Sequence, residues 1–158
     1  AWKKQWPGKK VYDEAGRLQT VKDGGLNSPD ATTYDYYPTG MRSGVTYPNG
    51  YRETYEYFGD NQLARLCNIR TDGTLLDEYL YTYDGAKNQL TEQHTSTSGP
   101  KATTETTTFE YDSRAQVVRV QYGGSKTVAY TYDLAGNRIV WRDRVFRVGR
   151  DGKLRAVN

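Results

Sequence analysis

The chain has little of what most compact cores and many active sites are built from. Among its 158 residues there are one cysteine, one methionine, three phenylalanines and one histidine. A single cysteine, Cys67, excludes an internal disulfide and a metal site built from cysteines. No apolar run approaches the roughly 18 residues of a membrane-spanning helix. The N-terminal segment AWKKQWPGKKV lacks the apolar stretch of a signal peptide, so an export signal, if one exists, is expected on a longer parent chain.

The scarcity of histidine and cysteine also bears on catalysis. A Ser-His-Asp or Cys-His arrangement would have to use His94, which lies in the polar segment Gln93-His94-Thr95. The carboxylates Asp13, Asp84, Asp112 and Asp133 recur once per repeat, which is better explained by turn capping than by a catalytic pair facing one cleft. No loop has the alternating Asp/Asn spacing of a calcium site. We therefore expect no catalytic residue, no metal site and no cofactor, and we predict that the chain is not an enzyme.

Tyrosine, glycine and threonine are abundant instead. Fifteen tyrosines and sixteen glycines favour pleated strands and tight turns over a helical core. An aromatic content of 13% argues against disorder. No window has a convincing helical stripe, so the composition predicts an all-β fold.

Charge is concentrated at the two ends, although the formal net charge is only +3. The first ten residues include Lys3, Lys4, Lys9 and Lys10. Near the other end, Arg142, Arg144, Arg147 and Arg150 form a candidate site for a polyanion such as a heparin-like polymer or acidic lipid. The alternative is the solvated face of a terminal hairpin. Nucleic acid is not an expected partner, because no known nucleic-acid module accompanies these arginines.

A repeated motif organises the chain. Its clearest copies are YDEAGRL at residues 12–18 and YDLAGNR at residues 132–138, and weaker copies start at Tyr36, Tyr57, Tyr83 and Tyr111. The intervals between the leading tyrosines range from 21 to 28 residues. This variable period is typical of β-hairpins with loops of unequal length, since a helical solenoid holds its period more strictly.

Each copy of the motif has the chemistry of a turn. An aspartate after the tyrosine can accept a backbone N–H two residues further on, and a glycine four residues after the tyrosine supplies a positive φ. We expect Asn61 and Asn88 to replace that glycine, and Ala115 to distort its turn. The segment Tyr47-Pro48-Asn49-Gly50 predicts a turn at the opposite end of a hairpin. The predicted turn residues are Asp13, Gly16, Gly40, Asn49, Gly50, Asp84, Asp112, Asp133 and Gly136.

Tyrosines recur at every second position before the motifs, which places them on one face of a strand. Cross-strand aromatic packing that stabilises the sheet is one interpretation. The alternative is a carbohydrate-binding surface in which the rings of Tyr55, Tyr57, Tyr79 and Tyr81 stack against sugars.

Three segments are predicted from these patterns. A basic lead-in covers residues 1–10, an array of β-hairpins covers residues 11–141, and a basic terminal hairpin covers residues 142–158. The predicted fold is a curved antiparallel sheet of tandem hairpins. The open edges of such a sheet need a partner, so we expect the rest of a parent chain, a protein partner or self-association to cover them.

The Tyr-Asp-x-x-Gly motif, its spacing and the Tyr-Pro-Asn-Gly turn closely resemble the YD repeat of the Rhs family over residues 11–141. The resemblance implies a β-sheet that spirals into a hollow shell around a toxin domain, as in polymorphic toxins, insecticidal toxin complexes and teneurins. The chain is too short to close such a shell. It also lacks the Asp-Pro-x-Gly-Leu motif that ends the family's repeats, so no residue here inherits a self-cleavage role.

These observations predict a structural role. We expect a wall or scaffold segment of a larger bacterial protein that is secreted or displayed at the cell surface. A glycan-binding module that uses the same tyrosines is the alternative.

Overall fold

The computed structural model describes residues 8–22, 30–124, 126–139, 145–148 and 154–157, with side chains described up to residue 139. The chain divides into two compact units, residues 1–78 and 79–158. Every regular element in the described ranges is a β-strand, so none of them provides a helix that could cross a membrane.

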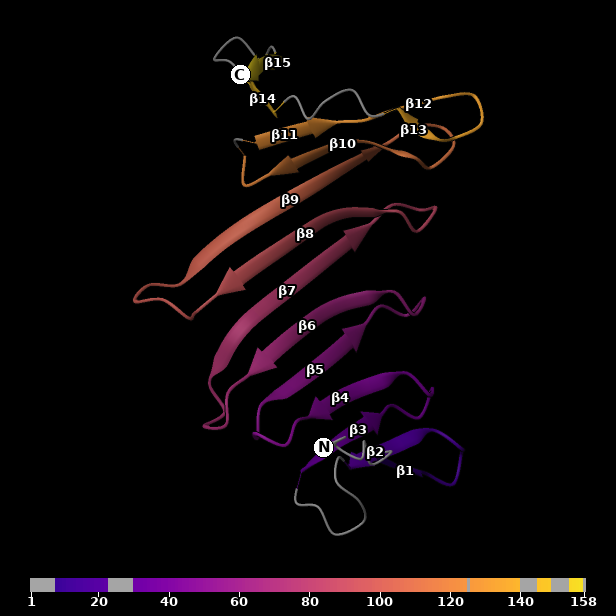
Figure 1. Ribbon diagram of the computed structural model, residues 1–158, viewed down its shortest axis with the longest axis vertical. Helices are drawn as coiled ribbons and strands as arrows, with labels where there is room; N and C mark the ends of the chain where they lie inside the picture. The colour runs from indigo at the N-terminus through magenta and orange to yellow at the C-terminus, as the bar shows by residue number, and fades with distance from the viewer. Residues whose placement is uncertain (1–7, 23–29, 125, 140–144, 149–153, 158) are drawn as a thin grey trace, which may run out of the picture. The chain divides into compact units, whose positions relative to one another are not determined.

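The first unit is a run of antiparallel strands in which each strand pairs with the next along the chain (Figure 1). Its strands are β1 (Lys9–Tyr12), β2 (Leu18–Lys22), β3 (Ala31–Tyr36), β4 (Arg42–Thr46), β5 (Arg52–Tyr57) and β6 (Leu63–Ile69). Strand β7 (Leu75–Tyr83) begins in this unit and ends in the second.

The second unit continues with the same up-and-down pattern. Its strands are β8 (Gln89–Ser96), β9 (Thr103–Tyr111), β10 (Val117–Tyr122) and β11 (Lys126–Ala129). A short separate hairpin follows, formed by β12 (Thr131–Tyr132) and β13 (Arg138–Ile139). The last strands, β14 (Val145–Val148) and β15 (Leu154–Val157), pair antiparallel, and β14 also pairs with β11.

A bulge recurs just before the motif turns. The pairing register shifts between Val11 and Tyr12, between Asp35 and Tyr36, and between Glu56 and Tyr57. The partner strand β10 shows the same irregularity between Val117 and Arg119. Because a bulge bends and twists a strand locally, these positions set the direction in which each chain reversal starts.

The most buried described side chains lie in the middle of strands. Val45 is 3% exposed and lies opposite Tyr34 and Glu53 on the neighbouring strands. Val120 is 4% exposed and lies opposite Phe109 and Val128. Most other strand residues are half-buried, so cross-strand side-chain pairs rather than a thick core stabilise the fold.

Ion pairs also cross the strands of the first unit. Arg65 on β6 contacts Glu56 on β5 at 2.9 Å and Glu78 on β7 at 2.7 Å. These groups are partly exposed, which limits each pair to a small contribution to stability.

The predicted all-β antiparallel array of hairpins is confirmed. The predicted segment boundaries stay a prediction. Strand β1 starts at Lys9, inside the predicted basic lead-in, and the two compact units meet within β7. The last two strands pair as expected of a terminal hairpin, while residues 149–153 between them lie outside the described residues.

Candidate functional site

The repeated turns form the most regular feature of the described chain. Eight of them share one backbone pattern, in which the first turn residue donates its N–H to the carbonyl four residues on and accepts from the N–H three residues on. We call six of these the motif turns, because each follows a motif tyrosine; their first residues are Asp13, Tyr37, Phe58, Asp84, Asp112 and Asp133. The other two begin at Tyr47 and Arg70, at the opposite ends of hairpins.

Aspartate at the first turn position holds the turn closed. The carboxylate of Asp13 accepts the N–H of Ala15 at 3.0 Å and of Arg17 at 2.8 Å. Asp84 accepts the equivalent N–H groups of Ala86 and Asn88, both within 2.9 Å. The hydrogen bond to the backbone of Arg17 is the main cause that lowers the pKa of Asp13. These contacts are the ones expected of the turn aspartates.

Three of the four turns without aspartate at the first position use the third position instead. Asn49, Asp60 and Asp72 accept the N–H two residues further on, from Tyr51, Gln62 and Thr74 respectively. That N–H occupies the same place in the turn as the N–H of Arg17. A polar side chain at either position therefore satisfies the same backbone donor.

The residue with positive φ differs from the prediction in one motif turn. Gly16, Gly40, Gly50 and Gly136 have φ between 75° and 89°, and Asn61 has φ 70°, as expected. In the fourth motif turn the position belongs to Lys87, with φ 71°, so the prediction of Asn88 is wrong. The turn is no longer than the others, because its hydrogen bonds join Asp84 to Lys87 and Asn88 in the common pattern.

Ala115 also occupies the positive-φ position, with φ 59°. The predicted distortion is wrong, because the hydrogen bonds from Asp112 to Gln116 and from Ala115 to Asp112 are 2.9 and 3.0 Å long. The carboxylate of Asp112 accepts two further N–H groups in this turn. The hydrogen bonds therefore hold alanine in a conformation that normally favours glycine.

The motif tyrosines connect successive hairpins. The hydroxyl of Tyr36 donates to the carbonyl of Leu18 at 2.7 Å. Tyr111 and Tyr132 donate to the carbonyls of Gln89 and Val117, each at 2.8 Å. In every case the acceptor lies five residues after the first residue of the preceding motif turn. The sequence predicted aromatic packing for these tyrosines but gave no indication of this hydrogen bond.

Successive motif turns also contact one another. The guanidinium of Arg17 lies 4.7 Å from the ring centre of Tyr36 and donates to the carbonyl of Tyr37 at 3.3 Å. Tyr37 in turn donates to the carbonyl of Tyr55 at 2.8 Å. In the second unit, Arg114 and Gln116 donate to the carbonyls of Leu134 and Gly136, each at 3.4 Å. The motif therefore supplies contacts between repeats as well as closing each turn.

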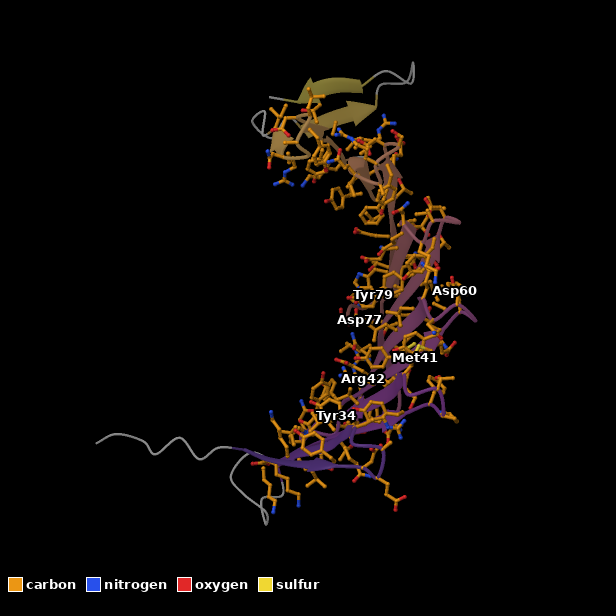
Figure 2. All side chains as sticks on the ribbon, turned by 90° about the vertical axis from the view of Figure 1, so that its right-hand side faces the viewer. Tyr34, Met41, Arg42, Asp60, Asp77 and Tyr79 are labelled. Atoms are coloured by element: carbon orange, nitrogen blue, oxygen red, sulfur yellow. The ribbon has the colours of Figure 1, made fainter. Side chains whose placement is uncertain are left out.

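Two of the tyrosines considered for carbohydrate binding lie on β5 and are half-buried. The hydroxyls of Tyr55 and Tyr47 both donate to the carboxylate of Glu53, and for Tyr47 the distance is 2.6 Å. That hydrogen bond is the main cause that raises the pKa of Tyr47 to about 12. Arg42 lies 5.1 Å from the ring centre of Tyr34 and 5.9 Å from that of Tyr55, and Figure 2 shows Tyr34 and Arg42 on the same side of the sheet.

The other two tyrosines of that set, Tyr79 and Tyr81, lie on β7 in the second unit and are also half-buried. The ring of Tyr79 stacks on His94, with ring centres 4.4 Å apart and planes 4° apart. Burial is the main cause that raises the pKa of Tyr81 to about 12, and the carboxylate of Glu92 adds to it. Carbohydrate binding by these four tyrosines stays a prediction.

The remaining candidate groups are the thiol of Cys67, clusters of metal-ligating side chains and the proposed polyanion-binding arginines. Cys67 is 3% exposed, and burial raises the pKa of its thiol. No cluster of three metal-ligating side chains occurs among the described residues. Of the proposed polyanion-binding arginines, Arg142, Arg144 and Arg150 lie outside the described residues, and Arg147 is described only as a backbone position in β14.

No protein-family model and no curated protein matches this chain. Its fold does match solved structures of toxin complexes. One is a chain in the structure of the Photorhabdus luminescens Tc holotoxin pore with a TccC3 mutation, at TM-score 0.68 and 18% identity over 92% of this chain. Another is a chain of the TcdB2–TccC3–Cdc42 crystal structure, at TM-score 0.68 and 17% identity over 89% of this chain.

These matches define the class of fold. This chain is an all-β array of antiparallel hairpins with the fold found in those toxin-complex chains. It spans only 8% of the length of each of them. The resemblance to the YD repeat that the motifs indicated therefore holds at the level of the three-dimensional fold.

Proposed function

We propose that this chain is a wall segment of a YD-repeat shell in a larger toxin-delivery protein of the Rhs type. The observation that carries the proposal is the fold match, which extends over 92% of this chain but only 8% of the matched chain. A segment of that relative size serves as a portion of a wall rather than as a whole container.

The contacts between repeats support the same role. Each motif turn closes one hairpin through its own hydrogen bonds, and Tyr36, Tyr111 and Tyr132 each join their hairpin to the one before it. Such a design can be extended by adding hairpins, as a wall requires. We propose that the segment has no catalytic role of its own and that its parent protein is secreted or displayed at the cell surface.

A protease-protection experiment on the full-length protein that contains this chain tests the proposal. The part of the full-length protein that lies inside the shell should resist protease while the protein is intact. It should become cleavable when Tyr111→Ala and Tyr132→Ala together remove two contacts between hairpins. The control is Tyr122→Ala, because the Tyr122 ring is 40% exposed and lies outside the motif. The proposal would be contradicted if the enclosed part were cleaved equally fast in the unsubstituted protein and in the double variant.

A further inference from the structure

Strand β1 lies at one edge of the first unit among the strands that the structure describes. Among the described strands, its only hydrogen-bonded neighbour is β2. The motif tyrosine at the end of β1, Tyr12, is 56% exposed, whereas Tyr36 at the end of β3 is half-buried. The hydroxyl of Tyr12 has no hydrogen-bond partner among the residues that the structure describes. The first repeat therefore has its motif tyrosine but lacks, in that part of the chain, the preceding hairpin that Tyr36 contacts.

The junctions between successive hairpins follow one register. To describe it, we count from the first residue of each motif turn. The residue seven positions after one turn begins lies opposite the residue four positions before the next turn begins. Four junctions obey this relation, through the pairs Thr20 with Thr33, Gly44 with Thr54, Thr91 with Thr108, and Arg119 with Ala129. The loops that lead into these junctions differ in length, so the register does not come from the loops.

The tyrosine hydrogen bond belongs to the same geometry. At three of the four junctions the motif tyrosine donates to the carbonyl five residues after the preceding first turn residue. At the remaining junction Tyr37 donates to Tyr55 instead, and the ring of Tyr37 meets Tyr57 edge-on at 6.2 Å. The hydroxyl of a motif tyrosine therefore indicates the position of the strand that follows the preceding motif turn.

We propose that the β1 edge is a binding site for one further β-hairpin of the same repeat type. The second strand of the incoming hairpin runs antiparallel to β1. In this strand, the residue that lies opposite Lys9 is the one seven positions after the first residue of the incoming hairpin's motif turn. Its carbonyl five positions after that turn residue accepts the hydroxyl of Tyr12. This inference rests on the proposed wall function and adds to it the partner and the register at one edge.

The positive charge on β1 restricts which residues the incoming strand can place opposite Lys9. Lys9 and Lys10 on β1 are exposed, and Lys22 on β2 lies directly opposite Lys9. Like charges opposite one another destabilise a strand pair, whereas opposite charges stabilise it. The incoming residue that faces Lys9 is therefore acidic or uncharged. At the described junctions this position holds Thr20, Gly44, Thr91 and Arg119, and only a residue like Arg119 would be disfavoured here.

A chain with one added hairpin tests this proposal. In this variant, a second copy of residues 75–102 replaces residues 1–3 and is joined directly to residue 4. The copied Asp84 then precedes Asp13 by the same number of residues as Asp84 precedes Asp112 in the original chain. Hydrogen exchange of the β1 backbone amides is then measured in the original and the extended chain. We expect at least roughly tenfold slower exchange in the extended chain, because a new strand covers the edge.

Two substitutions separate the register from simple strand addition. Tyr12→Phe should speed β1 exchange about fivefold in the extended chain, as expected for loss of one hydrogen bond, and should leave the original chain unchanged. The matched control is Tyr51→Phe at a 38% exposed ring that follows the turn at Tyr47, which should change neither chain. In the added copy, Thr91→Lys should weaken the protection and Thr91→Glu should keep or increase it.

Two results would overturn the inference. Unchanged β1 exchange on addition of the hairpin would show that this edge does not bind a repeat. Equal protection of β1 in the extended chain and in its Tyr12→Phe variant would show that a strand binds in another register. Neither result bears on protease protection in the full-length protein, so a failure here is distinguishable from a failure of the proposed wall function.

Discussion

At the scale of single residues, the positive-φ position of the turn shows how a local backbone requirement is met by unlike side chains. Glycine fills it in most of the described turns, but Asn61, Lys87 and Ala115 fill it in three. A side chain with a β-carbon in this region costs roughly 1 kcal/mol or more. The hydrogen bonds of the turn and the pairing of the flanking strands offset that cost.

Replacing Ala115 by glycine should therefore stabilise the protein. Relief of the strain at φ 59° outweighs the greater freedom of glycine in the unfolded chain. We expect a gain of about 0.5–1 kcal/mol in the free energy of unfolding, measured by urea denaturation. The matched control is Ala135→Gly, one position earlier in the last motif turn and without positive φ, which should destabilise. A loss of stability with Ala115→Gly would refute the strain argument.

The turn aspartates also predict how stability depends on pH. A hydrogen bond from the side chain of Asn88 is the main cause that lowers the pKa of Asp84 below its ordinary value of 3.8. A carboxyl whose pKa is lower in the folded state stabilises the fold above its unfolded pKa, and that stabilisation is lost as pH falls through the folded pKa. The melting temperature should therefore fall as the pH is lowered below about 4.

Asp84→Asn tests this dependence, because the amide cannot titrate. The variant should melt at a lower temperature than the parent at neutral pH, and the two melting temperatures should converge as the pH falls to about 2 to 3. Glu14→Gln is the control for replacing a carboxylate by an amide, since Glu14 lies in an exposed turn position, and this variant should leave the melting temperature at neutral pH unchanged. A constant difference between Asp84→Asn and the parent at all pH values would contradict a role for the ionised carboxylate.

At the scale of elements, much of the fold could be predicted from the sequence, because period-two tyrosines and Gly-closed turns are local signals. The strands on either side of the turns at Asp13, Tyr47 and Asp133 follow from those signals. The assignment of Asn88 failed for a physical reason. Asn88 is intrinsically better than lysine at positive φ, but the bonds of the Asp84 carboxylate fix the turn one residue earlier.

The contacts between hairpins could not be predicted in the same way. The residues around a tyrosine do not indicate which group its hydroxyl binds, and the acceptor of Tyr111 lies 22 residues earlier in the chain. The acceptor is a backbone carbonyl, so no side-chain pattern identifies it. Only the strand register brings Tyr111 and Gln89 together.

The tyrosine hydrogen bonds between hairpins predict a specific loss of stability. Tyr111→Phe keeps the ring and removes only the hydroxyl that donates to Gln89. It should cost about 1 kcal/mol in the free energy of unfolding, as expected for one partly buried hydrogen bond. Tyr122→Phe is the control, because its ring is 40% exposed and packs against Lys126 through the ring face, and it should change stability by less than about 0.5 kcal/mol. Equal effects of the two substitutions would show that the hydroxyl of Tyr111 has no special role.

At the scale of the whole molecule, the central claim is that the chain is an array of interchangeable hairpins joined in one register. Each described junction uses the same offset between motif turns, whatever the residues or the loop length. In such an array stability comes from each hairpin and from its contacts with its neighbours. A whole hairpin repeat can then be removed if the turns on both sides keep their register.

Deleting residues 37–57 tests this claim most directly. The deletion joins Tyr36 to the turn that begins at Phe58 and removes β4 and β5 together, so β3 pairs with β6 through a motif turn. The matched deletion of residues 47–57 removes β5 and one turn, so β4, which does not end in a motif tyrosine, leads into the turn at Phe58, and β6 is reversed relative to its original direction against β1 to β3. We predict that the first variant folds, with a β-sheet circular dichroism spectrum and cooperative thermal unfolding, and that the second does not. Loss of folding in both variants would contradict the account.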